Sequence, residues 1–370
     1  MKKLLAFPAS KPGIILTGAV IGILAPVLVL LGNPANMGIC VACFVRDTAG
    51  ALGLHRAAIV QYLRPEIPAF ILGSFLAASF AGEFKARTGS APIVRFVLGA
   101  FSMIGALVFL GCPWRAWLRL AGGDWNAISG ILGLVAGIVA GIVFLKRGYS
   151  LGRNFPAPKV AGYVMPVLAL GLVALAVLVP LFGRGADGQA IGPIFTSEKG
   201  PGSMAAPILV SLVVGLVIGF LAQRSRFCTV GAVRDVVLFR DPHLALGIAA
   251  LVVFAFGTNL VLGQFKPGFE GQPVAHTDGL WNFLGMALSG LAFTLAGGCP
   301  GRQLFLSGEG DGDAGIFVLG MLVGAGFAHN FNLASSATGP SPYGPGAVIF
   351  GLVVVALIGA VSRERAGGKA

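Results

Sequence analysis

Long apolar runs alternate with short polar segments along the whole chain. A helix needs about 20 apolar residues to cross the hydrocarbon core of a bilayer, and ten runs are long enough or nearly so. We therefore predict an all-α protein that crosses the membrane ten times. The predicted spans are residues 12–32, 66–82, 92–111, 125–145, 160–183, 204–222, 243–263, 280–298, 312–333 and 346–362.

Four shorter segments interrupt this pattern, and they begin near Cys40, Cys112, Cys228 and Cys299. Each is apolar enough to be buried but too short or too broken to cross a membrane. Irregular backbone at membrane depth is tolerated only where it is buried in protein or lines a wet cavity. We therefore predict that these segments are re-entrant loops that carry short helices.

Composition supports a membrane protein, because 56% of the residues are hydrophobic and 11% are charged. Many of the 57 glycines stand four residues apart inside apolar runs, as at Gly133, Gly137 and Gly141. This spacing lets transmembrane helices approach closely.

The two halves of the chain repeat each other. Cys299 follows Cys112 at an offset of 187 residues (299 − 112), and Cys228 follows Cys40 at 188 (228 − 40). Other residues match at these offsets: Arg46 with Arg234, Asp47 with Asp235, Arg115 with Arg302, Asp124 with Asp311, Gly133 with Gly320, and Gly137 with Gly324. We interpret residues 1–183 and 204–370 as two transmembrane repeats joined by an external linker, 184–203.

Each repeat has five spans, which is an odd number, so the second repeat begins on the opposite side of the membrane from the first. The two repeats therefore insert in opposite directions. Lys and Arg are concentrated in the loops that this topology places inside, as the positive-inside rule requires. Two stretches are exceptions, 55–64 and the pair Arg115 and Arg119. The fold class is thus two inverted five-span repeats whose re-entrant helices meet at the centre. Both termini are expected in the cytoplasm and the chain in a prokaryotic inner (plasma) membrane.

Positive charge exceeds negative charge by 12, from 26 Lys and Arg against 14 Asp and Glu. In a soluble protein this would raise nucleic acid as a partner, but long basic runs with interleaved aromatic residues are lacking in the sequence. The excess is instead explained by loop charges that set membrane orientation, together with the arginines beside the cysteines.

The strings Gly111-Cys112-Pro113-Trp114-Arg115 and Gly298-Cys299-Pro300-Gly301-Arg302 carry the candidate chemistry. Proline suits the first turn of a helix, which places each cysteine at a helix N-terminus. There the macrodipole and the free backbone N–H groups favour a thiolate or a bound anion. The arginine follows one turn later and can pair with an oxyanion.

Structural roles remain open beside these functional ones. A buried cysteine can simply act as a small hydrophobe, although four at duplicated positions favour a site. Arg46 with Asp47, and Arg234 with Asp235, fit an ion pair as well as a substrate contact.

Three further predictions concern individual residues. Asp124 and Asp311 are expected as N-caps of the spans that follow them. Cys43, whose match is Gly231, is expected to pack or to assist the site.

The four histidines follow no metal-ligand spacing, and the sequence contains no phosphate loop or zinc motif. We therefore predict neither a metal nor a cofactor.

The duplicated cysteine strings resemble the YeeE/YedE family of membrane proteins over the whole chain, and most closely the YedE branch of selenium transporters. The resemblance implies an hourglass-shaped permease in which Cys40, Cys112, Cys228 and Cys299 pass a substrate inward by transient sulfur hydrogen bonds. Related members take up thiosulfate. It also implies a separate TusA/SirA-like sulfur-carrier protein as a partner. Trp114, where the second repeat has Gly301, makes the two halves unequal.

The resulting hypothesis is a permease that imports a selenium compound or a sulfur oxyanion, similar to selenite or thiosulfate. Its predicted path residues are Cys40, Cys112, Cys228, Cys299, Arg115, Arg302, Arg46 and Arg234, with Cys43 as a possible helper. The alternative is a membrane thiol redox or sulfur-transfer enzyme that uses the paired cysteines.

Overall fold

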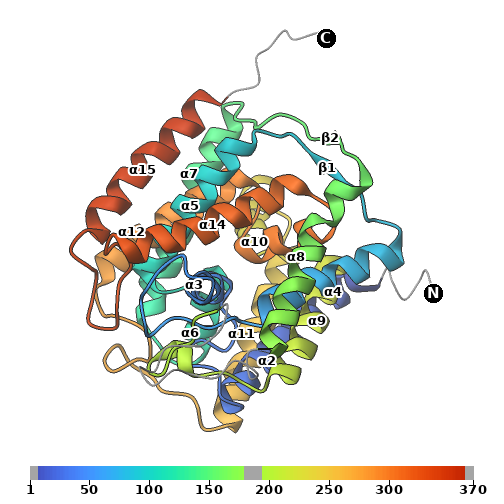
Figure 1. Cartoon of the computed structure of the whole chain (residues 1–370). Coiled ribbons are helices and arrows are strands. Elements are labelled where there is room, and N and C mark those ends of the chain that lie inside the picture. Colours follow the sequence, from blue (N-terminus) through green and yellow to red (C-terminus); the bar gives the residue numbers. More distant parts are fainter. Residues whose placement is uncertain (1–6, 179–193, 363–370) are drawn as a thin grey trace.

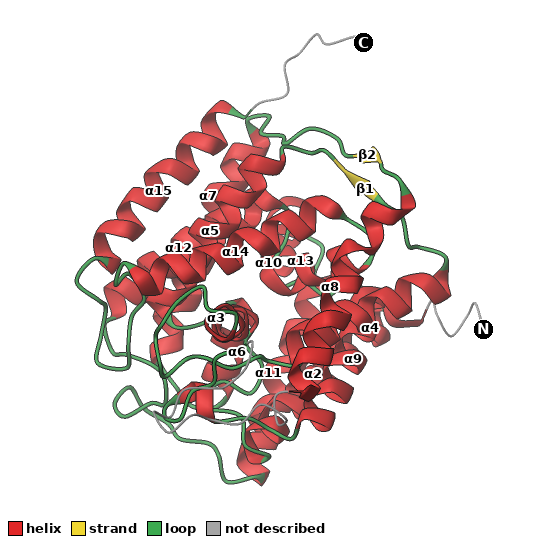
Figure 2. Ribbon diagram, viewed as in Figure 1, coloured by secondary structure: helices red, strands yellow, loops and turns green. Residues whose placement is uncertain are grey.

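The computed structural model describes residues 7–178 and 194–362, and almost all of its regular structure is helical (Figure 2). Each predicted span overlaps one long helix. These helices are α2 (Lys11–Leu30), α4 (Glu66–Ala81), α5 (Pro92–Phe109), α7 (Asn126–Lys146), α8 (Lys159–Leu178), α9 (Ile208–Ser225), α11 (His243–Val261), α12 (Gly279–Ala296), α14 (Gly312–Asn330) and α15 (Gly344–Val361).

Nine of these helices in the described residues are long and apolar enough to cross a membrane. The exception to the predicted ten spans is α4, which has 16 residues. It begins only after Pro65 and ends at Gly82, which has the left-handed conformation (φ 67°) that stops a helix. Residues 179–183 of the predicted fifth span, and 184–193 of the predicted linker, lie outside the described residues.

Four short helices follow the four duplicated cysteines, as predicted. They are α3 (Val41–Ala51), α6 (Pro113–Ala121), α10 (Thr229–Phe239) and α13 (Pro300–Gly308). Cys40, Cys112, Cys228 and Cys299 are their N-caps. The smaller elements are η1 (Phe7–Ala9), η3 (Pro201–Ser203), and the strands β1 (Arg87–Thr88) and β2 (Phe155–Pro156), which pair antiparallel.

The long helices pack in pairs, and each pair has an equivalent pair formed by the matching helices of the other repeat. Helix α7 packs on α12, and its counterpart α14 packs on α5; likewise α2 packs on α11, and α9 packs on α4. Helices α5 and α12, which match each other, are in mutual contact at the centre. There the Ser289 hydroxyl donates to the carbonyl of Ser102, its own counterpart at 187 residues (289 − 102), over 2.9 Å. The packing therefore has an approximate two-fold relation.

Glycines make these close helix contacts possible. A Cβ on Gly133 would overlap the carbonyl of Phe283, and a Cβ on the matching Gly320 would overlap the carbonyl of Phe96. These two clashes are again related by 187 residues (320 − 133 and 283 − 96). The Gly-x-x-x-Gly spacing thus marks helix interfaces, as expected from the sequence.

The last helix of each repeat departs from this relation. Helix α8 packs on α4, whereas α15 packs on α5 and α12. In Figure 1 the two helices accordingly lie on different sides of the molecule, with α15 at the left edge. The helices that surround the cysteines therefore follow the two-fold relation, whereas the last helix of each repeat does not.

The two predicted N-cap aspartates behave differently. Asp311 caps α14, because its carboxylate accepts the Ala314 N–H at 3.0 Å. The prediction for Asp124 is wrong, since the N-cap of α7 is Trp125. Asp124 instead lies one residue before the cap, where one carboxylate oxygen forms a buried ion pair with Arg119 at 2.6 Å and the other accepts the N–H of Asn126, the first residue of α7, at 3.0 Å.

Candidate functional site

The first pair of cysteines lies in the interior. The Sγ atoms of Cys40 and Cys112 are 3.8 Å apart, and both side chains are fully buried. This separation is well beyond the ~2.05 Å of a disulfide bond, so both are thiols. The Cys40 sulfur also accepts the backbone N–H of Cys43 at 3.3 Å, which is a capping bond. Residues 72 positions apart (112 − 40) thus meet at one place.

The second pair has a related arrangement. The Cys228 sulfur accepts the N–H of Gly231 at 3.2 Å and the N–H of Cys299 at 3.4 Å. The Cys299 sulfur accepts the N–H of Arg302 at 3.4 Å. The structure therefore brings the four predicted cysteines together as two pairs, one from each repeat.

All four sulfurs lie at the positive ends of short helices. Backbone N–H groups in the first turn of a helix have no partner within the helix, and the peptide dipoles add a partial positive charge there. Capping by a thiol satisfies one such group in α3, α10 and α13. The electrostatic environment at each pair consequently favours negative charge, whether on sulfur or on a bound anion.

Trp114 connects the two pairs. It stands two residues after Cys112, and its ring centroid is 5.3 Å from that of Phe227, which precedes Cys228. A Cβ on Gly301, two residues after Cys299, would lie 3.0 Å from the Trp114 ring. The indole therefore fills the space between the pairs, and the residue that matches it in the second repeat is small because the indole occupies its place.

Arg115 is fully buried beside the first pair. Its Nε donates to the Asn36 carbonyl at 2.7 Å, and its Nη2 donates to the Val274 carbonyl at 2.9 Å. Its Nη1 donates to the Leu110 carbonyl and lies 3.4 Å from the Cys43 sulfur. Among the described residues no carboxylate forms an ion pair with it. The guanidinium is held by backbone carbonyl dipoles.

Cys43 belongs to this cluster, although it has no match in the second repeat. Besides touching Arg115, its sulfur donates to the Leu110 carbonyl at 3.9 Å. The structure therefore places the predicted helper residue at the site.

Arg302 has a different environment from its match. Its Nη1 is 3.1 Å from the carboxylate of Glu309, and Glu309 also pairs with Arg226 at 3.0 Å and with Arg87 at 3.6 Å. Arg226 extends this network to Glu83 at 2.8 Å. Burial raises the pKa of Glu83, but hydrogen bonds from arginine and glutamine side chains outweigh it and lower the pKa overall. Arg302 thus has a carboxylate partner within the protein, which it shares with two other arginines.

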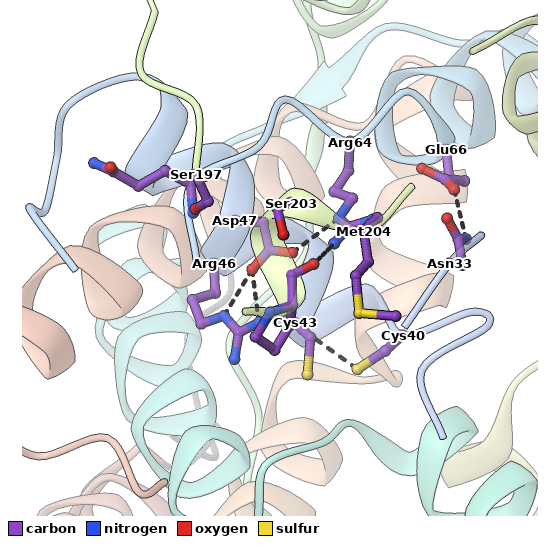
Figure 3. Close-up of polar contacts among 12 residues, drawn as sticks. Asn33, Cys40, Cys43, Arg46, Asp47, Arg64, Glu66, Ser197, Ser203 and Met204 are labelled. Atoms are coloured by element: carbon purple, nitrogen blue, oxygen red, sulfur yellow. Dashed lines mark hydrogen bonds and ion pairs between the residues drawn. The ribbon is translucent and has the colours of Figure 1, made fainter. Parts of the chain in front are cut away.

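Arg46 and Arg234 form ion pairs with the aspartates that follow them, at 2.6 Å to Asp47 and at 2.8 Å to Asp235. In the first repeat a second arginine, Arg64, also bonds Asp47 at 2.8 Å (Figure 3). Neither Arg46 nor Arg234 is brought to a cysteine by a hydrogen bond among the described residues.

Sequence reasoning did not place Arg64 at the site, but it carried a signal. Arg64, Arg115 and Arg119 all belong to the stretches that break the positive-inside rule, and all three side chains are fully buried. They are therefore interior groups and not loop charges. Buried arginine is costly in a membrane protein and commonly marks a functional region.

Glu66 was also missed. It is buried, accepts hydrogen bonds from Asn33 and Ser211 at 3.0 Å each, and appears with Asn33 in Figure 3. Its position one residue after Pro65, at the start of a predicted span, resembled an ordinary helix start.

The histidines do not form a metal site in the described part of the chain, where no group of three potential ligands occurs. His276 bonds the Val108 carbonyl at 2.8 Å, and burial lowers the pKa of its ring. His55 and His329 stack on each other at 4.5 Å between ring centroids. These rings contribute to packing.

The buried thiols and arginines within a bundle of long apolar helices define a multi-pass membrane protein with an interior thiol site. Residues 224–363 match the family model described as "Sulphur transport". This match supports the predicted resemblance to the YeeE/YedE family over that segment.

Two curated relatives are similar to part of the chain. The thiosulfate transporter TsuA of Escherichia coli (strain K12) is 29% identical over 107 residues, which are 29% of this chain and 30% of the relative. The thiosulfate transporter TsuA of Spirochaeta thermophila is 34% identical over 105 residues, which are 28% of this chain and 31% of the relative. The similarity thus spans about a third of the length of each relative.

Proposed function

We propose that the protein is a permease that carries a sulfur oxyanion of the thiosulfate type across the membrane. The observation that supports this most is the pair of buried cysteines at helix N-termini in each half, with Cys40 and Cys112 3.8 Å apart. The names of the two relatives, both thiosulfate transporters, point to the same substrate class.

The chemistry of the site suits such an anion. A thiol is a weak hydrogen-bond donor, and the terminal sulfur and oxygens of thiosulfate are acceptors. Helix N-termini add an attraction for negative charge without binding it covalently. A conducting path requires sites that attract the anion enough for it to enter and bind it weakly enough for it to leave, and the weak hydrogen bonds of sulfur groups suit both conditions.

In this proposal the anion moves from the Arg115 side to the Cys40–Cys112 pair, passes Trp114, and reaches the Cys228–Cys299 pair. Arg302 then faces the anion near the far end of the path, beyond the Cys228–Cys299 pair. Cys43 assists at the Cys40–Cys112 pair. Arg46 and Arg234, which are ion-paired, contribute to the electrostatic field around the path and make no direct contact.

Several features of the proposal extend the sequence predictions. The two repeats, 1–183 and 204–370, are inverted in the membrane, with a linker at 184–203 outside. The chain lies in a prokaryotic inner membrane with both termini in the cytoplasm. Selenite remains a second candidate substrate, and a separate TusA/SirA-like protein remains a candidate acceptor on the inner side.

Replacing Cys112 or Cys299 by alanine tests the path. Each variant should lose at least about nine-tenths of the labelled thiosulfate uptake into proteoliposomes, because one step of the relay is missing. Thr258→Ala is the matched control, since this hydroxyl only bonds the Phe254 carbonyl of its own helix. Equal amounts of folded protein are verified by size exclusion. Wild-type uptake by both cysteine variants would refute the path, and competition with selenite would rank the two substrates.

The alternative of a thiol redox or sulfur-transfer enzyme makes a separate prediction. It requires the paired cysteines to pass through disulfide or persulfide states during turnover, which mass spectrometry of acid-trapped protein would detect. The transporter names of the relatives favour a path of unmodified thiols.

A further inference from the structure

A cavity of about 450 Å³ lies next to the segment that leads to Cys40. Its lining includes Asn36, Gly38, Gly122, Lys266 and Gln272. Gly38 is two residues before Cys40, so the cavity adjoins the segment that carries the first thiol. A water molecule takes about 30 Å³ in the liquid, so the space can hold an oxyanion of five heavy atoms together with several waters.

The corresponding place in the second repeat is filled by charged side chains. In the register that matches Cys40 with Cys228, Gly38 corresponds to Arg226 (38 + 188). In the register that matches Cys112 with Cys299, Gly122 corresponds to Glu309 (122 + 187). Arg226 and Glu309 form an ion pair at 3.0 Å. Two glycines therefore stand in one repeat where a salt bridge stands in the other.

Backbone hydrogen bonds confirm that these places correspond. The N–H of Lys266 donates to the Gly122 carbonyl at 2.9 Å, and the N–H of Lys85 donates to the Glu309 carbonyl at 3.0 Å. Gly122 and Glu309 also hold the same position, as C-caps of α6 and α13. The cavity thus results from the loss of side chains at equivalent positions.

The next residues along these two segments extend the pattern. The N–H of Gly268 bonds the Gly123 carbonyl at 3.0 Å, and the N–H of Arg87 bonds the Gly310 carbonyl at 3.2 Å. Gly268 therefore corresponds to Arg87, a third member of the ion-pair network on Glu309. Three glycines therefore stand around the C-cap of α6 at positions whose equivalents around the C-cap of α13 are Arg226, Glu309 and Arg87.

The electrostatics of the cavity follow from these replacements. Arg115 lacks the carboxylate that Glu309 provides to Arg302, and its Nε bonds the carbonyl of Asn36 in the cavity lining. Lys266 adds a second positive charge, and it has no ion pair within the described ranges 7–178 and 194–362. The carboxylate of Asp124 accepts a hydrogen bond from the Asn36 amide but is already paired with Arg119 at 2.6 Å.

We propose that this cavity is a binding site for a sulfur oxyanion, in which the anion occupies the place that the Glu309 carboxylate takes in the other repeat. The proposal rests on the proposed function and names the site where the anion is held before it reaches the thiols. The side-chain amides of Asn259 and Gln264 supply neutral donors around it, whereas the amide of Gln272 bonds the Lys266 and Gly268 carbonyls and holds the loop that lines the cavity. From there Arg115 leads to Cys43, 3.4 Å from its guanidinium, and to the first cysteine pair.

The equivalence of the repeats supplies a direct test, Gly122→Glu. A Cβ at this position would meet Asn36 at 3.4 Å and backbone oxygens at 3.5 Å, which is ordinary contact, and Gly122 has an αR backbone that any residue adopts. Glu309 shows that a carboxylate here can reach the matching arginine. We expect Gly122→Glu to bind thiosulfate at least tenfold more weakly than Gly122→Gln, which has the same shape without the charge. This difference corresponds to about 1.4 kcal/mol.

Binding is measured by isothermal titration calorimetry on purified full-length protein in nanodiscs, and uptake of labelled thiosulfate is measured in proteoliposomes. Lys266→Gln is a second variant that leaves α6 unchanged, and it should also weaken binding, whereas Lys266→Arg should not. Gly346→Glu places the same charge at an exposed position of α15 with open space around it, and it should leave the affinity unchanged.

The outcomes separate this inference from the proposed function. Wild-type uptake with equal affinities for Gly122→Glu and Gly122→Gln would overturn the cavity site and leave the permease standing. If the wild type binds thiosulfate but does not take it up, and Gly122→Glu abolishes the binding, the cavity site is supported and transport is rejected. If the wild type neither binds nor carries thiosulfate, both are wrong.

Discussion

Trp114 is a residue at which the two repeats differ greatly in size, since its counterpart is Gly301. Its indole is fully buried between the two cysteine pairs, and its N–H has no hydrogen-bond partner among the described residues. An unsatisfied buried donor costs about 1–3 kcal/mol, so such a group is retained where it serves a purpose. In the proposed path an oxyanion would accept this hydrogen bond as it passes, and the ring would close the path behind it.

Two substitutions separate these contributions. Trp114→Phe keeps an aromatic ring but removes the N–H, so we expect a KM for thiosulfate that is a few-fold higher and vesicles that remain tight. Trp114→Gly reproduces the counterpart residue and removes the ring, so we expect leakage of sulfate from loaded proteoliposomes. Vesicles that stay as tight with Trp114→Gly as with the wild type would show that the indole does not close the path. A melting curve checks that both variants are folded.

At the scale of elements, the matched helices α3 and α10 carry the same Arg-Asp pair in different surroundings. Asp47 in α3 is fully buried between Arg46 and Arg64. Asp235 in α10 is partly exposed, as is its partner Arg234, whose side chain is 30% exposed. Removing one partner of a buried ion pair leaves an uncompensated charge, whereas an exposed pair contributes little.

The pair of substitutions Asp47→Asn and Asp235→Asn tests this difference. We expect Asp47→Asn to lower the free energy of unfolding by about 3–5 kcal/mol, because two buried arginines lose their carboxylate. Asp235→Asn should cost less than about 1 kcal/mol. Thermal melting of the purified proteins in the same detergent gives the comparison. Equal melting temperatures for the two variants would contradict the structural difference between α3 and α10.

At the scale of the whole molecule, the exchange of packing partners relates the two repeats by an approximate two-fold axis near Ser102 and Ser289. If this axis lies in the membrane plane, as an inverted repeat requires, equivalent loops face opposite sides of the membrane. The segments that begin at Lys85 and Lys266 are equivalent, because they dock on Glu309 and Gly122 through the same backbone bond.

Lys85→Cys and Lys266→Cys test the orientation, since both lysines are exposed while the native cysteines are buried. We expect a membrane-impermeant maleimide to label only the Lys266 variant in intact cells, and to label the Lys85 variant only after the membrane is opened. Labelling of both from the same side would exclude the inverted arrangement.

The sequence predicted the elements well because long apolar runs and helix-starting prolines act locally. The positions of the ten long helices and of the four cysteine-capped short helices followed from these signals. The failures concern side-chain partners, which a pattern of apolar residues and prolines does not show. Asp124 stands one residue before the helix cap, where Arg119 and the Asn126 N–H bond its carboxylate, and the buried position of Arg64 was visible only as an exception to a charge rule.

The duplicated cysteine strings, read from the sequence alone, determined which residues correspond in the two repeats and that each thiol would begin a short helix. The helix starts follow from local sequence signals, and the correspondence of residues follows from the constant offset between the two repeats. Only the tertiary structure decided which cysteines pair, that Trp114 stands between the pairs, and that Arg302 has the carboxylate of Glu309 beside it while Arg115 forms no ion pair among the described residues. These depend on the distances between groups that folding brings together, and such distances determine both the charge and the space available to an anion.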